Sequence, residues 1–257
     1  MNTSSNFPDL TRPVDPSIPA AVHVWHASVQ FVRNLLPELE LTLDFSERVR
    51  AGAFHHTRDR ESFVLARGML RWLLGKYVDV PPAEIEIKYG EFGKPYFSPD
   101  HIEFNVSHSG GQVLIAFARG LSIGVDIEIA QPGVDLADIV TRFFSAEELA
   151  EWNRIPTEFQ TDAFYRLWTR KEAFVKGLGL GFSLPLDSFA VTFAPGSKCR
   201  VTRTPTGFPA SSEWSLVDLT ESARSLTDAS TPGTYAALAV PSPRIAASHW
   251  FIRNSLP

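Results

Sequence analysis

The stretch Ile123-Gly124-Val125-Asp126-Ile127-Glu128-Ile129 decides how the surrounding chain folds. Successive side chains of a β-strand point to opposite faces, so its three isoleucines and one valine share one face. Asp126 and Glu128 share the other face with Gly124. We therefore expect a half-buried strand within Leu121–Ile129 that carries two neighbouring carboxylates, and a glycine that leaves room for a ligand beside them.

The two carboxylates have two interpretations. Like charges side by side on one strand face repel each other, and a solvated strand normally offsets them with cations. One interpretation is an exposed acidic face of a half-buried sheet. The other is a magnesium site, because Mg²⁺ is held by one or two carboxylates together with water and substrate phosphates. The single cysteine, Cys199, excludes a cysteine-based metal site and an internal disulfide.

A third acidic residue stands in a predicted helix, Thr161–Lys176. Apolar residues recur there at helical spacing, and Glu172 and Lys176 lie four positions apart on one face. Such a pair is common in helices and has a functional meaning only if this face meets Asp126 and Glu128. In that arrangement Glu172 would be a third metal ligand and Lys176 a phosphate contact.

The remaining pattern alternates between strands and helices. Helices are predicted over residues 58–77, 134–144 and 146–153, and strands over 21–29, 85–89, 101–107, 112–118, 189–193, 214–219 and 235–240. Gly110-Gly111 predicts a hairpin turn. The order of elements is similar in both halves, so we expect an α+β fold of two α/β subdomains, over residues 21–120 and 121–250.

Bulk composition excludes some classes of function. The chain has 257 residues, of which 44% are hydrophobic and 21% charged, as in ordinary globular proteins. Residues 1–20 are proline-rich without a leader pattern, and we expect a flexible lead-in. The longest apolar runs fall short of the roughly 20 residues that span a membrane. The net charge of −5 argues against nucleic-acid binding, and the lone cysteine fits a cytoplasmic location.

Three arginines lie on one face of the predicted helix 58–77. Arg60, Arg67 and Arg71 are spaced by seven and four residues, so they stack along the helix. They form either a solvated basic stripe or a wall that receives phosphates.

A serine and a histidine are adjacent within Phe104–Ser109. Neighbouring strand residues point to opposite faces, which argues against Ser107 and His108 as the nucleophile and base of a hydrolase. His108 is then either structural or a hydrogen-bond donor to an anion. The glycines of Gly177-Leu178-Gly179-Leu180-Gly181 follow a helix and are expected to turn the chain, because a nucleotide-binding loop precedes its helix.

In this order and spacing, the segments resemble the surfactin-type branch of the phosphopantetheinyl transferase superfamily. The resemblance runs from about Trp25 to Val240, and its motifs are Phe92–Pro95, Phe104–Ser109, Ile123–Glu128, Arg142–Ser145 and Trp168–Lys176. It implies two lobes related by pseudo-twofold symmetry, each with a small, mainly antiparallel sheet and a long helix. It also implies a monomer that is an internal pseudo-dimer, with coenzyme A in the cleft between the lobes.

The activity that the resemblance implies is a magnesium-dependent transfer. The phosphopantetheine arm of coenzyme A would move to a serine of an acyl, polyketide or peptidyl carrier protein, with release of adenosine 3′,5′-bisphosphate. Carriers of fatty acid, polyketide and nonribosomal peptide synthesis all remain open as partners.

The resemblance also assigns site residues. Asp126, Glu128 and Glu172 would bind Mg²⁺, with Mn²⁺ as an alternative. The residues expected to contact coenzyme A are Arg48, Arg60, Phe92, Gly93, Lys94, Val106, Ser107, His108, Glu172 and Lys176, with Arg50 as a further basic candidate. The expected catalytic groups are Glu148, Glu172 and Lys176, and Glu148, Glu172 or a metal-bound hydroxide would accept the proton of the carrier serine.

Two other functions would use the same acidic residues. A carboxylate–metal phosphohydrolase would cleave nucleotides without a protein acceptor. A non-catalytic module would bind coenzyme A or a carrier protein without turnover.

Overall fold

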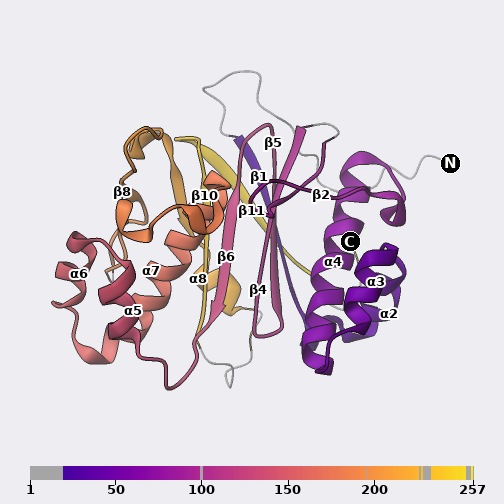
Figure 1. Ribbon diagram of the computed structural model, residues 1–257, viewed down its shortest axis with the longest axis horizontal. Helices are drawn as coiled ribbons and strands as arrows, with labels where there is room; N and C mark the ends of the chain where they lie inside the picture. Colours follow the sequence, from indigo (N-terminus) through magenta and orange to yellow (C-terminus); the bar gives the residue numbers. More distant parts are fainter. Residues whose placement is uncertain are drawn as a thin grey trace.

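The computed structural model describes residues 20–98, 101–194, 196–225, 227, 233–252 and 256. Strands occupy the middle of the molecule, and helices lie at both ends (Figure 1). This confirms the expected α+β class. The predicted lead-in lies outside the described residues, except for Ala20, which begins the first strand.

The first sheet has four strands in the order β11-β1-β5-β4. They are β11 (Ile245–Ile252), β1 (Ala20–Ser28), β5 (Gln112–Arg119) and β4 (Ile102–Ser109). The predicted hairpin joins β4 to β5, and its turn residues Gly110 and Gly111 have positive φ angles of 58° and 83°. The sequence analysis did not predict β11, which pairs with β1 in parallel and brings the end of the chain back to the first sheet.

The second sheet has three antiparallel strands in the order β6-β10-β9. They are β6 (Gly124–Ile129), β10 (Thr234–Val240) and β9 (Ser215–Asp218). Two small hairpins complete the strands: β2 (Lys88–Tyr89) pairs with β3 (Pro95–Tyr96), and β7 (Ala190–Val191) pairs with β8 (Val201–Arg203).

Each sheet has one long helix packed beside it. The helix α4 (Thr57–Val78) belongs to the first half, and α7 (Thr157–Leu178) belongs to the second. The shorter helices are α1 (Val29–Val32), α2 (Leu36–Leu41), α3 (Phe45–Gly52), α5 (Leu136–Phe143), α6 (Ala146–Trp152) and α8 (Thr220–Arg224). The described 3₁₀ helices, each of one turn, are η1 (Arg33–Leu35), η2 (Pro82–Glu84), η4 (Gly181–Ser183), η5 (Leu186–Ser188) and η6 (Ser211–Glu213). None of the described helices is long and apolar enough to cross a membrane.

A buried apolar cluster joins the two sheets. Val24 of β1 and Leu114 of β5 pack there with Val125 and Ile127 of β6 and Leu238 of β10. The predicted apolar face of β6 is therefore buried, and it faces the other sheet. The division into two subdomains near Gly120 stays a prediction. The strand β11 follows residues 121–240 in sequence but belongs to the first sheet.

Candidate active site

The helix α7 lies directly on the backbone of β6, because glycines form the contact. A Cβ atom on Gly124 would be 2.0 Å from the carbonyl oxygen of Ala173 and 2.2 Å from the amide nitrogen of Gly177. Our expectation that Gly124 leaves room for a ligand is therefore wrong, since α7 fills that space. The close contact instead brings Glu172 and Lys176 next to the acidic face of β6.

Side chains of β4 bind the backbone of β6 and fix the register between the two sheets. Asn105 Oδ1 accepts a hydrogen bond from the Val125 amide at 2.9 Å, and Ser107 Oγ accepts one from the Ile127 amide at 3.3 Å. Ser109 Oγ accepts the next, from the Ile129 amide at 3.2 Å. These alternate side chains replace the backbone ladder and place the end of β4 opposite Asp126 and Glu128.

Asp126 is buried at the centre of the site, with 2% of its surface exposed. Its Oδ1 accepts hydrogen bonds from Ser107 Oγ at 2.8 Å and from Lys176 Nζ at 2.6 Å. Its Oδ2 is buried and has no hydrogen-bond partner among the described residues. A buried carboxylate oxygen is costly to leave unpaired, so this atom is suited to binding a cation. The burial excludes the interpretation of an exposed acidic face.

The two glutamates beside Asp126 respond to its charge. Burial, then the charge of Asp126, raises the pKa of Glu128 to about 7, although Ser109 Oγ donates to Glu128 Oε2 at 2.8 Å. Burial and then Asp126 also raise the pKa of Glu172, and Lys176 opposes that rise. The helix face that carries Glu172 and Lys176 thus meets the acidic face of β6, as the functional interpretation required.

The donor set fits a hard divalent cation. It consists of carboxylate oxygens, which Mg²⁺ prefers, and Asp126 offers one oxygen without a partner. Within the described part of the chain, no group of three or more His, Cys, Asp or Glu residues is already arranged around one point. Where one or two protein carboxylates hold Mg²⁺, water and phosphate oxygens of a substrate commonly supply its other ligands.

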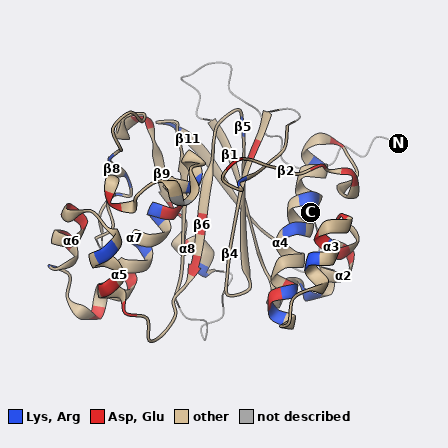
Figure 2. Ribbon diagram, in the orientation of Figure 1, with Lys and Arg blue, Asp and Glu red and all other residues tan. Residues whose placement is uncertain are grey.

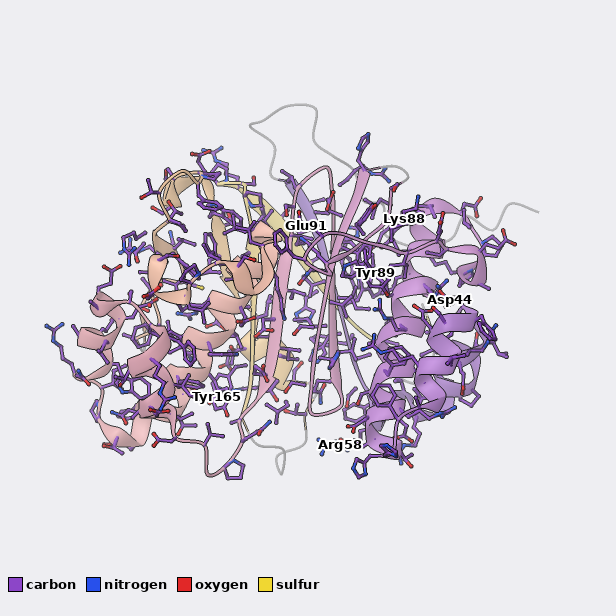
Figure 3. The ribbon with its side chains drawn as sticks, viewed as in Figure 1. Asp44, Arg58, Lys88, Tyr89, Glu91 and Tyr165 are labelled. Carbon is purple, nitrogen blue, oxygen red and sulfur yellow. The ribbon has the colours of Figure 1, made fainter. Side chains whose placement is uncertain are left out.

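His108 lies in a positively charged region. Burial, followed by the charges of Lys176, Arg67 and Arg50, lowers the pKa of His108. It lines a cavity of about 480 Å³ together with Arg50 and Arg58. Acidic residues of β6 lie on one side of β4 and basic residues of α4 on the other (Figure 2). The sequence analysis missed Arg58, which stands in the first turn of α4, at the lower end of that helix in Figure 3.

Two of the predicted basic contacts have other partners. Arg48 donates to the carbonyl oxygen of Leu43, and Arg60 forms an ion pair with Glu40 at 2.5 Å. Neither is among the described residues that line the cavity at His108. The structure thus favours Arg50 and Arg58 over Arg48 and Arg60 as the basic residues near His108.

The three arginines of the α4 stripe have different surroundings. Arg71 is buried, and it pairs with Asp44 and Glu47, each at 2.5 Å, and donates to the Ile85 carbonyl at 2.7 Å. Arg67 instead donates to the hydroxyl of Tyr89 at 2.8 Å, and Figure 3 shows Tyr89 beside α4. Both interpretations of the stripe are therefore wrong for Arg71, which holds α3 against α4.

The β2–β3 hairpin reaches the end of α7 through Lys94. Its Nζ donates to the carbonyl oxygens of Lys176 at 3.0 Å and Ile123 at 3.3 Å, and burial lowers its pKa. Lys94 therefore stabilises the last turn of α7. Phe92 is half exposed at the tip of the same hairpin, beside Gly93, whose φ of 75° forms the turn. Val106 packs against the core of the first half.

Glu148 is buried in the second half of the molecule and is paired there with Lys171. It is 2% exposed, caps α6 through the amide and hydroxyl of Ser145, and accepts Lys171 Nζ at 2.6 Å and 2.8 Å on its two oxygens. The amide of Val191 donates to it as well, at 3.0 Å. The structure does not support general-base duty for Glu148, because every contact of its carboxylate is with a buried group of its own half.

An apolar cavity of about 460 Å³ borders the acidic residues. The residues lining it are Phe143, Trp168, Glu172, Val175, Lys176, Gly181, Leu184, Pro185 and Leu186. Sequence reasoning missed this feature, since the residues come from α5, α7 and the segment that follows α7. The site can therefore accept an apolar group next to Glu172 and Lys176.

Two family models match long parts of this chain. Residues 122–236 match the family described as "4′-phosphopantetheinyl transferase superfamily", and residues 30–119 match "4′-phosphopantetheinyl transferase, N-terminal". The chain is 32% identical over 202 residues to 4′-phosphopantetheinyl transferase HetI of Nostoc sp., covering 77% of this chain and 82% of that protein.

Two further proteins are similar over a smaller part. The chain is 38% identical over 147 residues to 4′-phosphopantetheinyl transferase Sfp of Bacillus subtilis, which covers 56% of this chain and 64% of that protein. The crystal structure of Thermotoga maritima holo-[acyl-carrier-protein] synthase matches with a TM-score of 0.36 and 16% identity, over 48% of this chain and 65% of that chain.

Proposed function

The chain belongs to the 4′-phosphopantetheinyl transferase superfamily and is a phosphopantetheinyl transferase, and on that premise we propose its substrates and its chemistry. It transfers the phosphopantetheine arm of coenzyme A to a serine hydroxyl of a carrier protein and releases adenosine 3′,5′-bisphosphate. The observation that carries this proposal is the buried Asp126, whose Oδ2 lacks a partner among the described residues while its Oδ1 accepts Lys176.

We propose that Asp126, Glu128 and Glu172 hold a magnesium ion, or manganese in its place. The ion would supply positive charge to the pyrophosphate oxygens of coenzyme A. The raised pKa values of Glu128 and Glu172 support this assignment, because carboxylates that repel one another are stabilised by a cation between them.

Lys176 holds positive charge at the point where phosphate charge develops. Its Nζ is within hydrogen-bond distance of Asp126 Oδ1 at 2.6 Å and Ser107 Oγ at 3.0 Å, which fixes its position without enclosing it. Phosphoryl transfer depends mainly on positioning and on charge neutralisation, so a fixed lysine of this kind is what the reaction requires.

Two cavities support an orientation for coenzyme A. The cavity at His108 is lined by Arg50, Arg58 and one acidic residue, Asp59, and its surplus of basic groups suits the phosphates of the adenosine end. The apolar cavity beside Glu172 suits the pantetheine arm and the approaching carrier serine. With Glu148 paired to Lys171, Glu172 is the carboxylate that we propose takes up the serine proton, because it lines the cavity in which the serine would approach.

Intact-mass spectrometry of an apo carrier protein incubated with coenzyme A and Mg²⁺ tests this function. The expected product is the carrier with one added phosphopantetheine arm. Asp126→Ala is expected to abolish the transfer while circular dichroism shows a folded chain, and Asp138→Ala, on an exposed pair with Arg142, serves as the control. Full activity of Asp126→Ala at saturating Mg²⁺ would refute the metal assignment.

The same experiment separates the alternative functions. A phosphohydrolase would cleave coenzyme A without changing the mass of the carrier. A binding module would leave both the coenzyme A and the carrier unchanged. A panel of acyl, polyketide and peptidyl carriers would show which of them is the partner. The monomeric state and the cytoplasmic location stay predictions.

A further inference from the structure

A separate cavity of about 750 Å³ lies in the second half of the molecule. Its described lining comes from residues 198–202, which include the start of β8, from residues 211–212 and 214–217 in and between η6 and β9, and from residues 243–245, which end at the start of β11. It shares no described lining residue with the acidic site or with the basic cavity at His108. We call it the β8–β9 groove.

The groove runs along the edges of two strands. Successive side chains of a strand point to opposite faces, so a cavity that touches Ser215, Leu216 and Val217 in succession lies at the edge of β9. The same holds for the five consecutive residues 198–202. Within the described chain, β9 pairs only with β10 and β8 pairs only with β7. Both are therefore edge strands within the described chain, and the groove lies beside each of them.

The walls of the groove are cationic. Lys198 and Arg200 are exposed, two positions apart, in the segment that leads into β8, and Arg244 is exposed on another wall. None of the three has an ion-pair partner among the described residues, and none of the described residues that line the groove is acidic. The neighbouring Glu213 is turned back onto the amide of Ala210 at 3.0 Å. This local positive charge stands out in a chain of net charge −5.

We propose that the β8–β9 groove binds an extended acidic segment of a partner protein, which adds as a strand along the edge of β9. Backbone groups of the edge would supply affinity, and the cations would select acidic side chains. A strand occupies roughly 160 Å³ per residue, from a rise of about 3.3 Å, a strand spacing of about 4.8 Å and a sheet thickness of about 10 Å. The cavity of about 750 Å³ thus has room for about five residues.

The spacing of the cations favours a peptide over a small anion. Lys198 and Arg200 are two residues apart in the segment that leads into β8. Acidic side chains on one face of an added strand are also two residues apart, about 6.6 Å along the strand. A single phosphate group would contact one of these cations and would leave the strand edges unpaired.

Fluorescence anisotropy with a labelled peptide, Glu-Val-Glu-Val-Glu, tests the proposal on the full chain. We expect saturable binding, at least about tenfold tighter than for Lys-Val-Lys-Val-Lys. Methylation of alternate backbone nitrogens keeps the charges but removes strand pairing, and is expected to weaken binding by at least about tenfold. The double charge reversal Arg200→Glu with Arg244→Glu should have a similar effect, whereas Arg154→Glu, an exposed arginine outside the groove, should not.

Hydrogen exchange locates the bound peptide. Slower exchange of the β8 and β9 amides is the result expected for strand addition. Three results would overturn the proposal: no saturable binding of the acidic peptide, equal binding of its N-methylated form, or full displacement of the peptide by an equal concentration of inorganic pyrophosphate. The last two would identify a simple anion site.

Discussion

The amide nitrogen of Gly177 lies so close to Gly124 that a Cβ atom on Gly124 would be only 2.2 Å from it. This contact between α7 and β6 is the foundation of the site, since it sets the distance from Lys176 to Asp126. A side chain at residue 124 would have to push the helix away, because the atoms in its path belong to backbone.

Replacement of Gly124 by alanine is therefore expected to destabilise the protein and to reduce transfer activity together. Overpacking of a core contact costs about 1–3 kcal/mol, and backbone atoms cannot move aside as a side chain does. Urea unfolding and turnover measure the two effects. Gly52→Ala is the matched control: a Cβ at this helical position meets no described atom within 4 Å, so its stability should be equal or slightly higher. Unchanged activity in Gly124→Ala would contradict the positioning role.

Arg58→Ala is expected to raise the KM for coenzyme A by about tenfold with little change in kcat. The reason is the loss of a charge-assisted hydrogen bond to phosphate, worth about 1.5 kcal/mol, that acts on binding and not on the reacting centre. Initial rates over a range of coenzyme A concentrations measure it. Arg48→Ala is the control, because Arg48 does not line the basic cavity among its described residues. An equal effect of the two substitutions would show that the cavity is not where coenzyme A binds.

Glu148→Gln separates a structural role from catalysis. The substitution removes the partner charge of the buried Lys171, and breaking a buried ion pair costs about 3–5 kcal/mol. We expect a lower midpoint of urea unfolding, with the kcat of the folded fraction within about threefold of the parent. A general base would instead lose roughly 100-fold or more in kcat. Such a loss of kcat in a folded variant would show that Glu148 takes part in catalysis.

His26 and His249 predict a loss of stability in acid. Burial, together with His249, lowers the pKa of His26 to about 3, and burial lowers that of His249 to about 4. The unfolded chain takes up these protons near its ordinary histidine pKa of about 6.5, so stability falls as the pH drops from about 6.5 towards about 4. Each histidine contributes a slope of up to about 1.4 kcal/mol per pH unit.

Urea unfolding between pH 7 and pH 4, chosen as roughly the window set by these pKa values, checks the prediction. His249→Gln should remove about half of the slope. His56→Gln, at an exposed position, should leave it unchanged. If His249→Gln retains the full slope of the parent, the stacked pair of His26 and His249 is not the origin of the acid sensitivity.

Local spacing predicted the parts of the site that depend on one element at a time. The alternation of a strand placed Asp126 and Glu128 on one face of β6, and helical spacing placed Glu172 and Lys176 on one face of α7. The buried ion pairs that local spacing did not reveal join residues distant in sequence. The buried Arg71 is paired with Asp44, the N-cap of α3, and with Glu47 of α3, and Glu148 is paired with Lys171 of α7. Spacing cannot distinguish such buried ion pairs from solvated or catalytic groups.

The sequence by itself determined the α+β class, the β4–β5 hairpin and the acidic face of β6, because backbone geometry fixes the periods of strands and helices. Only the tertiary structure decided that α7 packs directly on Gly124. The same holds for the parallel pairing of β11 with β1 and for the hydrogen bonds from β6 amides to side chains of β4. The physical reason is that periodicity states which residues share a face, whereas the group that meets this face is set by packing between segments far apart in the chain.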